Sequence, residues 1–121
     1  MKVAGFGFRQ NATVDSLRDA LAATGVSGID AIATVAEKAN APVLTDFADA
    51  CGVPVRSVPK ADLPKADVAT QSEKSEKLFG TGSLSEAAAL IAAGPRARLI
   101  AVRAISPDRM ASCAVAESEG A

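Results

Sequence analysis

The stretch VAGFGFRQNATVDSLRDALAATG, residues 3–25, predicts a buried β-strand followed directly by an α-helix. Residues 3–8 are all apolar or glycine and end at Arg9, which is the pattern of a strand inside a sheet. Thr13 is a suitable helix N-cap, apolar residues then recur at helical spacing, and Gly25 is well suited to end the helix. A strand joined closely to a helix is the beginning of an α/β fold.

The same alternation continues along the chain. Residues 29–35 predict a second, apolar strand. We expect the next helix to be capped by Asn40, to carry Pro42 in its first turn and to end at Gly52. Residues 53–58 predict a third strand, weakened by a proline.

The segment 59–79 differs from the rest of the chain because it is polar and contains two prolines. We expect it to be a long loop with a helical turn near residues 61–63. Regular structure resumes after the sequence GTGS, where Ser83 and Glu86 match the S-x-x-E capping box ahead of an alanine-rich helix.

The end of the chain predicts two strands. A Gly-Pro pair stops the alanine-rich helix, residues 98–104 and 110–116 form a hairpin, and residues 117–121 form a tail. The order of elements is therefore β-α-β-α-β-loop-α-β-β. This order predicts one domain over residues 1–121, an α/β fold built as a three-layer α/β/α sandwich with a mixed, mostly parallel sheet of about five strands.

The composition argues against several classes of function. Charged residues make up 22% of the 121 residues, the formal net charge is -1, and there are four Phe but no Tyr or Trp. This composition lacks the basic excess and the aromatic stacking platforms of nucleic-acid-binding proteins, so we expect no nucleic acid as partner. No apolar run approaches the ~20 residues that cross a membrane, so we expect no membrane partner.

The sequence contains no histidine and only two cysteines, Cys51 and Cys113. The cysteines do not have the spacing of a zinc motif, and both lie on predicted apolar faces. We expect them to be small core residues and reduced thiols of a cytoplasmic protein, and we expect neither a metal nor a cofactor.

A candidate ligand site lies at one edge of the predicted sheet. In open α/β sheets, ligands bind beyond the carboxyl ends of the strands, and here three helices would begin at that edge. Helix N-termini offer free N–H groups and a partial positive charge, so the site would prefer an anion. The ligand-binding residues predicted from this placement are Gly5, Gly7, Arg9, Thr34, Lys38, Gly80, Gly82 and Ser83, with Lys74 and Lys77 as candidates to join them.

Each of these residues also has a structural interpretation, which the sequence leaves open. The glycines could relieve crowding between strand and helix, and Thr34 could bond to the backbone. The loop cations could be solvated, and Glu86 is expected as the capping partner rather than as a general acid.

Candidate catalytic residues at the same edge are Thr34, Glu37 and Lys38. Without imidazole, a carboxylate of raised pKa or a desolvated lysine would have to serve as the base of a hydrolase-type reaction. Two nucleotide motifs are incomplete. Gln10 occupies the third glycine position of the dinucleotide fingerprint, and GTGS lacks the lysine of a P-loop.

Six segments follow one another in an order that is known from one family. They are GFGFR (5–9), TVAEKANAPVL (34–44), CGVPV (51–55), Thr70-x-Ser72, GTGSLSEAAAL (80–90) and ASCAVA (111–116). Together they resemble the CobE/CbiG C-terminal domain family of cobalamin (vitamin B12) biosynthesis, nearly end to end. Ala41, where an acidic residue is common, and Ser112, where Thr is usual, depart from its pattern.

The resemblance implies a role in building the corrin ring, and it adds Ser72 to the ligand-binding residues. Precorrins carry many acetate and propionate groups, which an anion-binding edge would suit. We therefore predict a carrier or accessory factor that binds an acidic corrin-ring intermediate, either a precorrin or a hydrogenobyrinic-acid-like pigment.

Two alternatives are an enzyme that acts on a precorrin, such as a lactone hydrolase, and a docking subunit for other enzymes of the pathway. Because no further domain precedes this one in the sequence, we expect a free-standing member of the family rather than a multidomain one.

Overall fold

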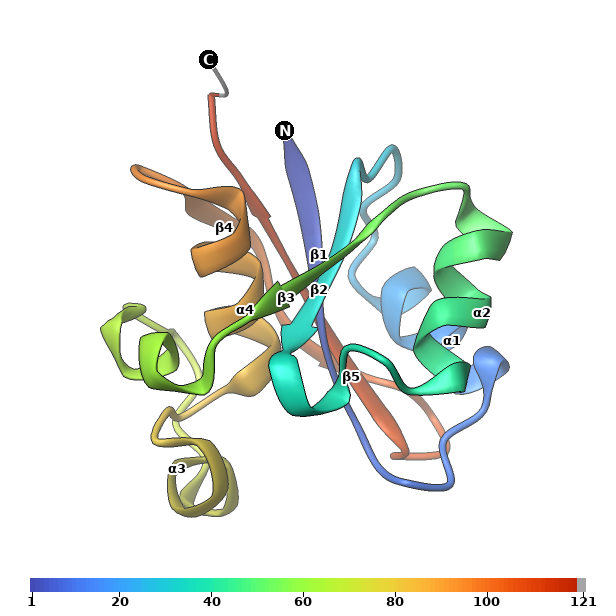
Figure 1. Ribbon diagram of the computed structural model, residues 1–121, viewed down its shortest axis with the longest axis horizontal. Coiled ribbons are helices and arrows are strands. Elements are labelled where there is room, and N and C mark those ends of the chain that lie inside the picture. Colours follow the sequence, from blue (N-terminus) through green and yellow to red (C-terminus); the bar gives the residue numbers. More distant parts are fainter. Residues whose placement is uncertain (120–121) are drawn as a thin grey trace.

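The computed structural model describes residues 1–119 of the chain as one α/β domain (Figure 1). The elements in chain order are β1 (Lys2–Phe8), α1 (Val14–Ala23), β2 (Ala31–Val35), the 3₁₀ turn η1 (Ala36–Lys38), α2 (Pro42–Cys51), β3 (Val55–Val58), the 3₁₀ segment η2 (Lys60–Lys65), α3 (Glu73–Phe79), α4 (Leu84–Ala93), β4 (Arg98–Ile105) and β5 (Ala111–Glu117).

The five strands form one mixed sheet in the order β3-β2-β1-β5-β4. The pairs β1–β2 and β2–β3 are parallel, whereas β5 is antiparallel to both of its neighbours. Four of the five strands therefore point the same way. Helices α1 and α2 cover one face of the sheet and α4 covers the other (Figure 1), which confirms the predicted fold class.

The two faces of the sheet bury two separate clusters. Side chains alternate along a strand, so Val3 faces α4 while Ala4 and Phe6 face α1 and α2. On the side of α1 and α2, the rings of Phe6 and Phe47 pack edge to face with 5.7 Å between centroids. The α4 side is built largely from alanine and valine, because α4 packs very close to the sheet.

Gly5 permits this close packing. A Cβ atom at Gly5 would lie 2.6 Å from the backbone N of Ala89 and closer still to the backbone O of Ser85. Both atoms belong to the backbone of α4 and cannot rotate away. Gly5 therefore marks the line along which α4 crosses β1.

The prediction that residues 59–79 form a long loop was wrong for much of that segment. The helical turn expected near residue 61 exists as η2, but a second helix, α3, follows it. The side chain of Ser72 caps α3, and Gly80 ends it in the left-handed conformation at φ 70°. No residue of α3 is buried, so the segment lacks the apolar periodicity by which a helix is normally recognised.

Local details of three other predictions also changed. Ala41, not Asn40, occupies the N-cap of α2, and Pro42 supplies its first turn without any side-chain cap. Cys113 is buried as expected, but Cys51 is exposed at the end of α2 and is not a core residue. Of the expected tail, Glu117 belongs to β5 and Ser118 pairs with Met1, while residues 120–121 lie outside the described residues.

Within residues 1–119, no helix is long and apolar enough to cross a membrane.

Candidate functional site

A groove of about 460 Å³ opens at the carboxyl end of β1, on the edge of the sheet predicted to bind a ligand. It lies between α3 on one side and the turn of the β4–β5 hairpin on the other, and the loop after β1 forms part of its wall. Its lining residues are Gly7, Phe8, Arg9, Gln10, Asn11, Lys38, Ser72, Lys74, Ser75, Leu78, Phe79, Leu84, Arg103, Ile105, Arg109, Met110, Ala111 and Ser112.

Positive charge dominates this groove. Five of the lining residues are cationic and none is a carboxylate: the cations are Arg9, Lys38, Lys74, Arg103 and Arg109. None of the five takes part in an ion pair with another described residue. Cations that are left without a counter-charge around one concave surface attract a ligand carrying several negative charges.

Lys38 is the cation that the structure holds most firmly. It lies at the end of η1, and its Nζ donates a hydrogen bond of 3.0 Å to the backbone O of Phe8. The same Nζ lies 5.0 Å from the centre of the Phe8 ring, within the range of a cation–π interaction. These two contacts fix the charge where β1 ends and leave donor capacity on the ammonium group.

The walls of the groove are apolar between the cations. Phe8, Phe79 and Leu84 contribute to them, together with Leu78 and Ile105. Leu78 and Ile105 are 51% and 48% exposed, an unusual state for large apolar side chains. A surface of this kind suits a ligand with a flat apolar body and charged groups at its margin.

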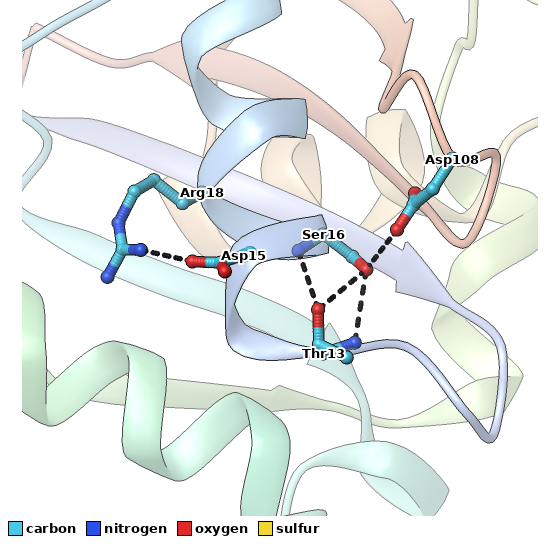
Figure 2. Close-up of polar contacts among 5 residues, drawn as sticks. All are labelled: Thr13, Asp15, Ser16, Arg18 and Asp108. Atoms are coloured by element: carbon cyan, nitrogen blue, oxygen red, sulfur yellow. Dashed lines mark hydrogen bonds and ion pairs between the residues drawn. The ribbon is translucent and has the colours of Figure 1, made fainter.

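The hairpin turn that carries Arg109 is tied to the start of α1 (Figure 2). The carboxylate of Asp108 accepts a hydrogen bond of 2.6 Å from the hydroxyl of Ser16, and others from the Ser106 hydroxyl and the Met110 N–H. These bonds hold the pKa of Asp108 below its ordinary value. Arg109 follows with φ 61°, a conformation that a non-glycine residue adopts only where surrounding contacts impose it.

Figure 2 also shows the hydrogen bonds that side chains of this protein make at the start of α1. Thr13 and Ser16 form a reciprocal capping box, and Asp108 accepts from the Ser16 hydroxyl. The N–H groups of Thr13 and Ser16 at the start of α1 therefore already have acceptors. The five cations of the groove are side chains of other segments.

Glu86 does not play the capping role that the S-x-x-E pattern predicted. Ser83 caps α4 by accepting from the Glu86 N–H, but the Glu86 carboxylate does not return to Ser83. It accepts hydrogen bonds from the N–H groups of Ala69, Thr70 and Arg103 and from the hydroxyl of Thr70. Burial raises the pKa of Glu86, but these hydrogen bonds outweigh it and hold the pKa below its ordinary value.

Residues 2–116 match the family model described as "Cobalamin synthesis G C-terminus". The match extends over nearly the whole chain and includes every strand of the sheet except the last residue of β5. The chain belongs to this family. Among curated protein sequences, none matches this chain significantly.

Solved structures of the family share the fold. CobE, a protein from the cobalamin (vitamin B12) biosynthetic pathway, superposes with a TM-score of 0.86 at 29% identity, covering 98% of this chain and 90% of CobE. Cobalamin biosynthesis protein chiG from Agrobacterium tumefaciens str. C58 gives a TM-score of 0.73 at 30% identity, covering 98% of this chain and 99% of that one.

A putative cobalamin biosynthesis protein G homolog from Sulfolobus solfataricus gives a TM-score of 0.69 over 99% of this chain but only 37% of its own length. At 23% identity, this likeness shows the fold alone.

Four residues of the predicted ligand set line the groove of this family member: Gly7, Arg9, Lys38 and Ser72. The other five do not: Gly5, Thr34, Gly80, Gly82 and Ser83. Thr34 is fully buried and its hydroxyl donates to the backbone O of Phe6, so it joins β2 to β1. Ser83 is buried at the start of α4.

The glycines outside the groove have structural positions. Gly5 admits α4, Gly80 ends α3, and Gly82 passes so close to Thr70 that a Cβ atom would lie 2.5 Å from the Thr70 O. Glu37, a candidate catalytic residue, also lies outside the groove, where its carboxylate faces Lys60 at 3.6 Å on the protein surface.

Sequence reasoning missed Arg103 and Arg109. Both lie on the β4–β5 hairpin, whereas the rule used for the prediction considers only the loops that follow parallel strands. Because β5 is antiparallel to β1, the hairpin turn reaches the same edge of the sheet. The signal available in the sequence was a pair of arginines close to a predicted turn.

Proposed function

We propose that this member of the family binds an acidic corrin-ring intermediate of cobalamin biosynthesis in the groove, as a carrier or accessory factor. The observation that carries the proposal is the combination of five unpaired cations, no carboxylate and apolar walls in one groove. The cobalamin pathway is the one shared by the family model and the solved relatives.

The chemistry of the ligand fits this lining. A precorrin or hydrogenobyrinic-acid-like pigment is a flat macrocycle with acetate and propionate groups around its margin. The macrocycle would lie against Phe8, Leu78 and Ile105, while the carboxylates meet arginine and lysine. Arginine in particular can form two parallel hydrogen bonds to one carboxylate.

Binding without chemistry is favoured by what the groove contains. A lactone hydrolase needs a base to activate water, and the groove lining includes no carboxylate. Lys38, the candidate lysine base, lines the groove, but its Nζ donates a hydrogen bond to the backbone O of Phe8 and lies over the Phe8 ring. Glu37 is exposed beside Lys60, and Thr34 is buried with its hydroxyl bonded to the backbone. We therefore favour a carrier over an enzyme, and we keep the cytoplasm as the proposed place of action.

The test is a titration of the purified protein with hydrogenobyrinic acid, followed by the visible spectrum and by the free pigment in an ultrafiltrate. We expect saturable retention of an otherwise unchanged pigment. A corrinoid whose carboxylates are all amides is the matched control, and we expect much weaker retention of it. A spectrum that continues to change with time would support an enzyme instead, and equal retention of both pigments would contradict binding through the cations.

A further inference from the structure

Glu86 is a fully buried carboxylate with no cationic partner among the described residues. It lies in the first turn of α4, where a negative charge suits the helix dipole. Four donors satisfy it: the N–H groups of Ala69 and Thr70 at 2.9 and 2.8 Å, the Thr70 hydroxyl at 2.8 Å and the Arg103 N–H at 2.7 Å. Such a charge is held in the interior only because these donors replace water.

The four donors come from two segments that lead to different walls of the groove. Ala69 and Thr70 precede Ser72, the N-cap of α3, while Arg103 belongs to the edge strand β4. The register of β4 against β5 shifts between Ala101 and Ala104, so Arg103 lies where the regular ladder is interrupted. The Glu86 carboxylate therefore accepts a hydrogen bond from an N–H group at an irregularity of β4, and it also joins that strand to the segment before α3.

Because the segment before α3 is fixed in this way, the position of α3 is fixed as well. We call residues 72–82 the α3 arm. Its two ends are joined by a hydrogen bond of 2.9 Å from the Ser72 N–H to the Gly82 O. Gly82 packs against Thr70 and Gln71 so closely that no side chain would fit. The position of Thr70 thus sets where the α3 arm begins and ends relative to the rest of the domain.

We propose that Glu86 is a positioning residue: it holds the α3 arm and Arg103 at the separation that a ligand in the groove requires. This proposal rests on the proposed function of the groove. Glu86 itself does not line the groove. It acts through the Arg103 side chain on one wall and through the α3 arm, which carries Lys74 and Leu78, on the other.

The main variant is Glu86→Gln, which keeps the shape of the side chain but turns an NH₂ group toward at least one of the donors. We expect its affinity for hydrogenobyrinic acid to fall at least about tenfold, the loss expected when a close charge pair is misplaced. Leu44→Ala is the matched control, because Leu44 belongs to α2 and is buried against the other face of the sheet. It should cost comparable stability and leave the affinity of the folded protein unchanged.

A double-mutant cycle separates positioning from general loosening. Once Arg103→Met has removed the guanidinium group, Glu86→Gln should cost clearly less affinity than it does in the wild-type background, because part of its effect is already lost. Fully additive losses would overturn the action through Arg103. If Glu86→Gln does not fold, Thr70→Val, which removes only the hydroxyl donor, decides the question, with a smaller loss of affinity expected.

The proposal and the function can fail separately. A wild-type protein that retains no pigment overturns the proposed function, and the role of Glu86 falls with it. A wild-type protein that binds pigment, next to a folded Glu86→Gln or Thr70→Val variant that binds equally well, overturns the positioning role alone. The exchange rates of the Thr70 and Arg103 amide protons provide the structural readout, because the two N–H groups bond to different oxygens of Glu86. Glu86→Gln keeps one oxygen and should speed the exchange of whichever N–H faces the new NH₂ group, whereas Leu44→Ala should speed neither selectively.

Discussion

Replacing Gly5 by alanine should destabilise the protein by about 3 kcal/mol without weakening the binding of a ligand to the folded molecules. The new Cβ atom would lie 2.6 Å from the Ala89 N, and α4 would have to move away from β1 by about 1 Å to restore an ordinary contact. Forcing extra atoms into a packed core costs about 1–3 kcal/mol. The upper end applies here because the opposing atoms are backbone.

The assay is urea unfolding together with thermal unfolding. For a domain of this size, a loss of about 3 kcal/mol lowers Tm by about 12 °C. Gly7→Ala is the matched control on the same strand, because its Cβ would meet mainly the hydroxyl of Ser112 at 3.0 Å, which can rotate. We expect that variant to lose less than about 1 kcal/mol.

The result that would refute this reasoning is a stable Gly5→Ala variant that binds pigment poorly. It would mean that Gly5 contacts the ligand, as first predicted from the sequence, and that α4 can move without cost. A variant that is as stable as the wild type and binds normally would also contradict the account, because it would show that the packing of α4 on β1 is loose.

Three further predictions follow from individual groups. Raising the salt concentration from about 0.05 M to about 0.5 M should weaken pigment binding. Arg9→Ala should reduce this salt dependence, because Arg9 lines the groove. Arg18→Ala should not reduce it, because Arg18 lies outside the groove and is paired with Asp15. The pKa of Glu86 is lower in the folded protein than its ordinary value of 4.5, so the resulting stability is present above pH 4.5 and is lost as the pH falls below it. Acid titration of unfolding should therefore show a gap between wild type and Glu86→Gln that narrows below pH 4.5; a constant gap would contradict an ionised Glu86. In native protein, a thiol reagent should modify the exposed Cys51 but not Cys113, which is fully buried, and two rapidly reacting thiols would be the contrary result.

The sequence was most informative where the signals were local. Thr13 caps α1 and Ser83 caps α4, both as predicted. The order of strands and helices was enough to predict a mixed sheet between helical layers. Because the carboxyl-edge rule depends only on that order, it also placed Arg9 and Lys38 on the side of the molecule where the groove lies.

The features that sequence reasoning missed are set by tertiary structure. Helix α3 buries no residue, so its sequence carries no periodic pattern that could identify it. Glu86 fits a capping box locally, but its carboxylate instead accepts hydrogen bonds from residues 16 or 17 positions away in the chain. Arg109 reaches the groove only because β5 runs antiparallel beside β1, which no local signal reveals.

Calorimetric titration of hydrogenobyrinic acid into the wild-type protein and into the double variant Arg9→Glu/Arg109→Glu tests the central claim most directly. Arg18→Glu is the control, since it reverses one exposed charge outside the groove. The account predicts one binding site per chain, an affinity at least about 100-fold weaker in the double variant, and an unchanged affinity in the control. Equal binding by all three proteins, or no binding by the wild type, would contradict it.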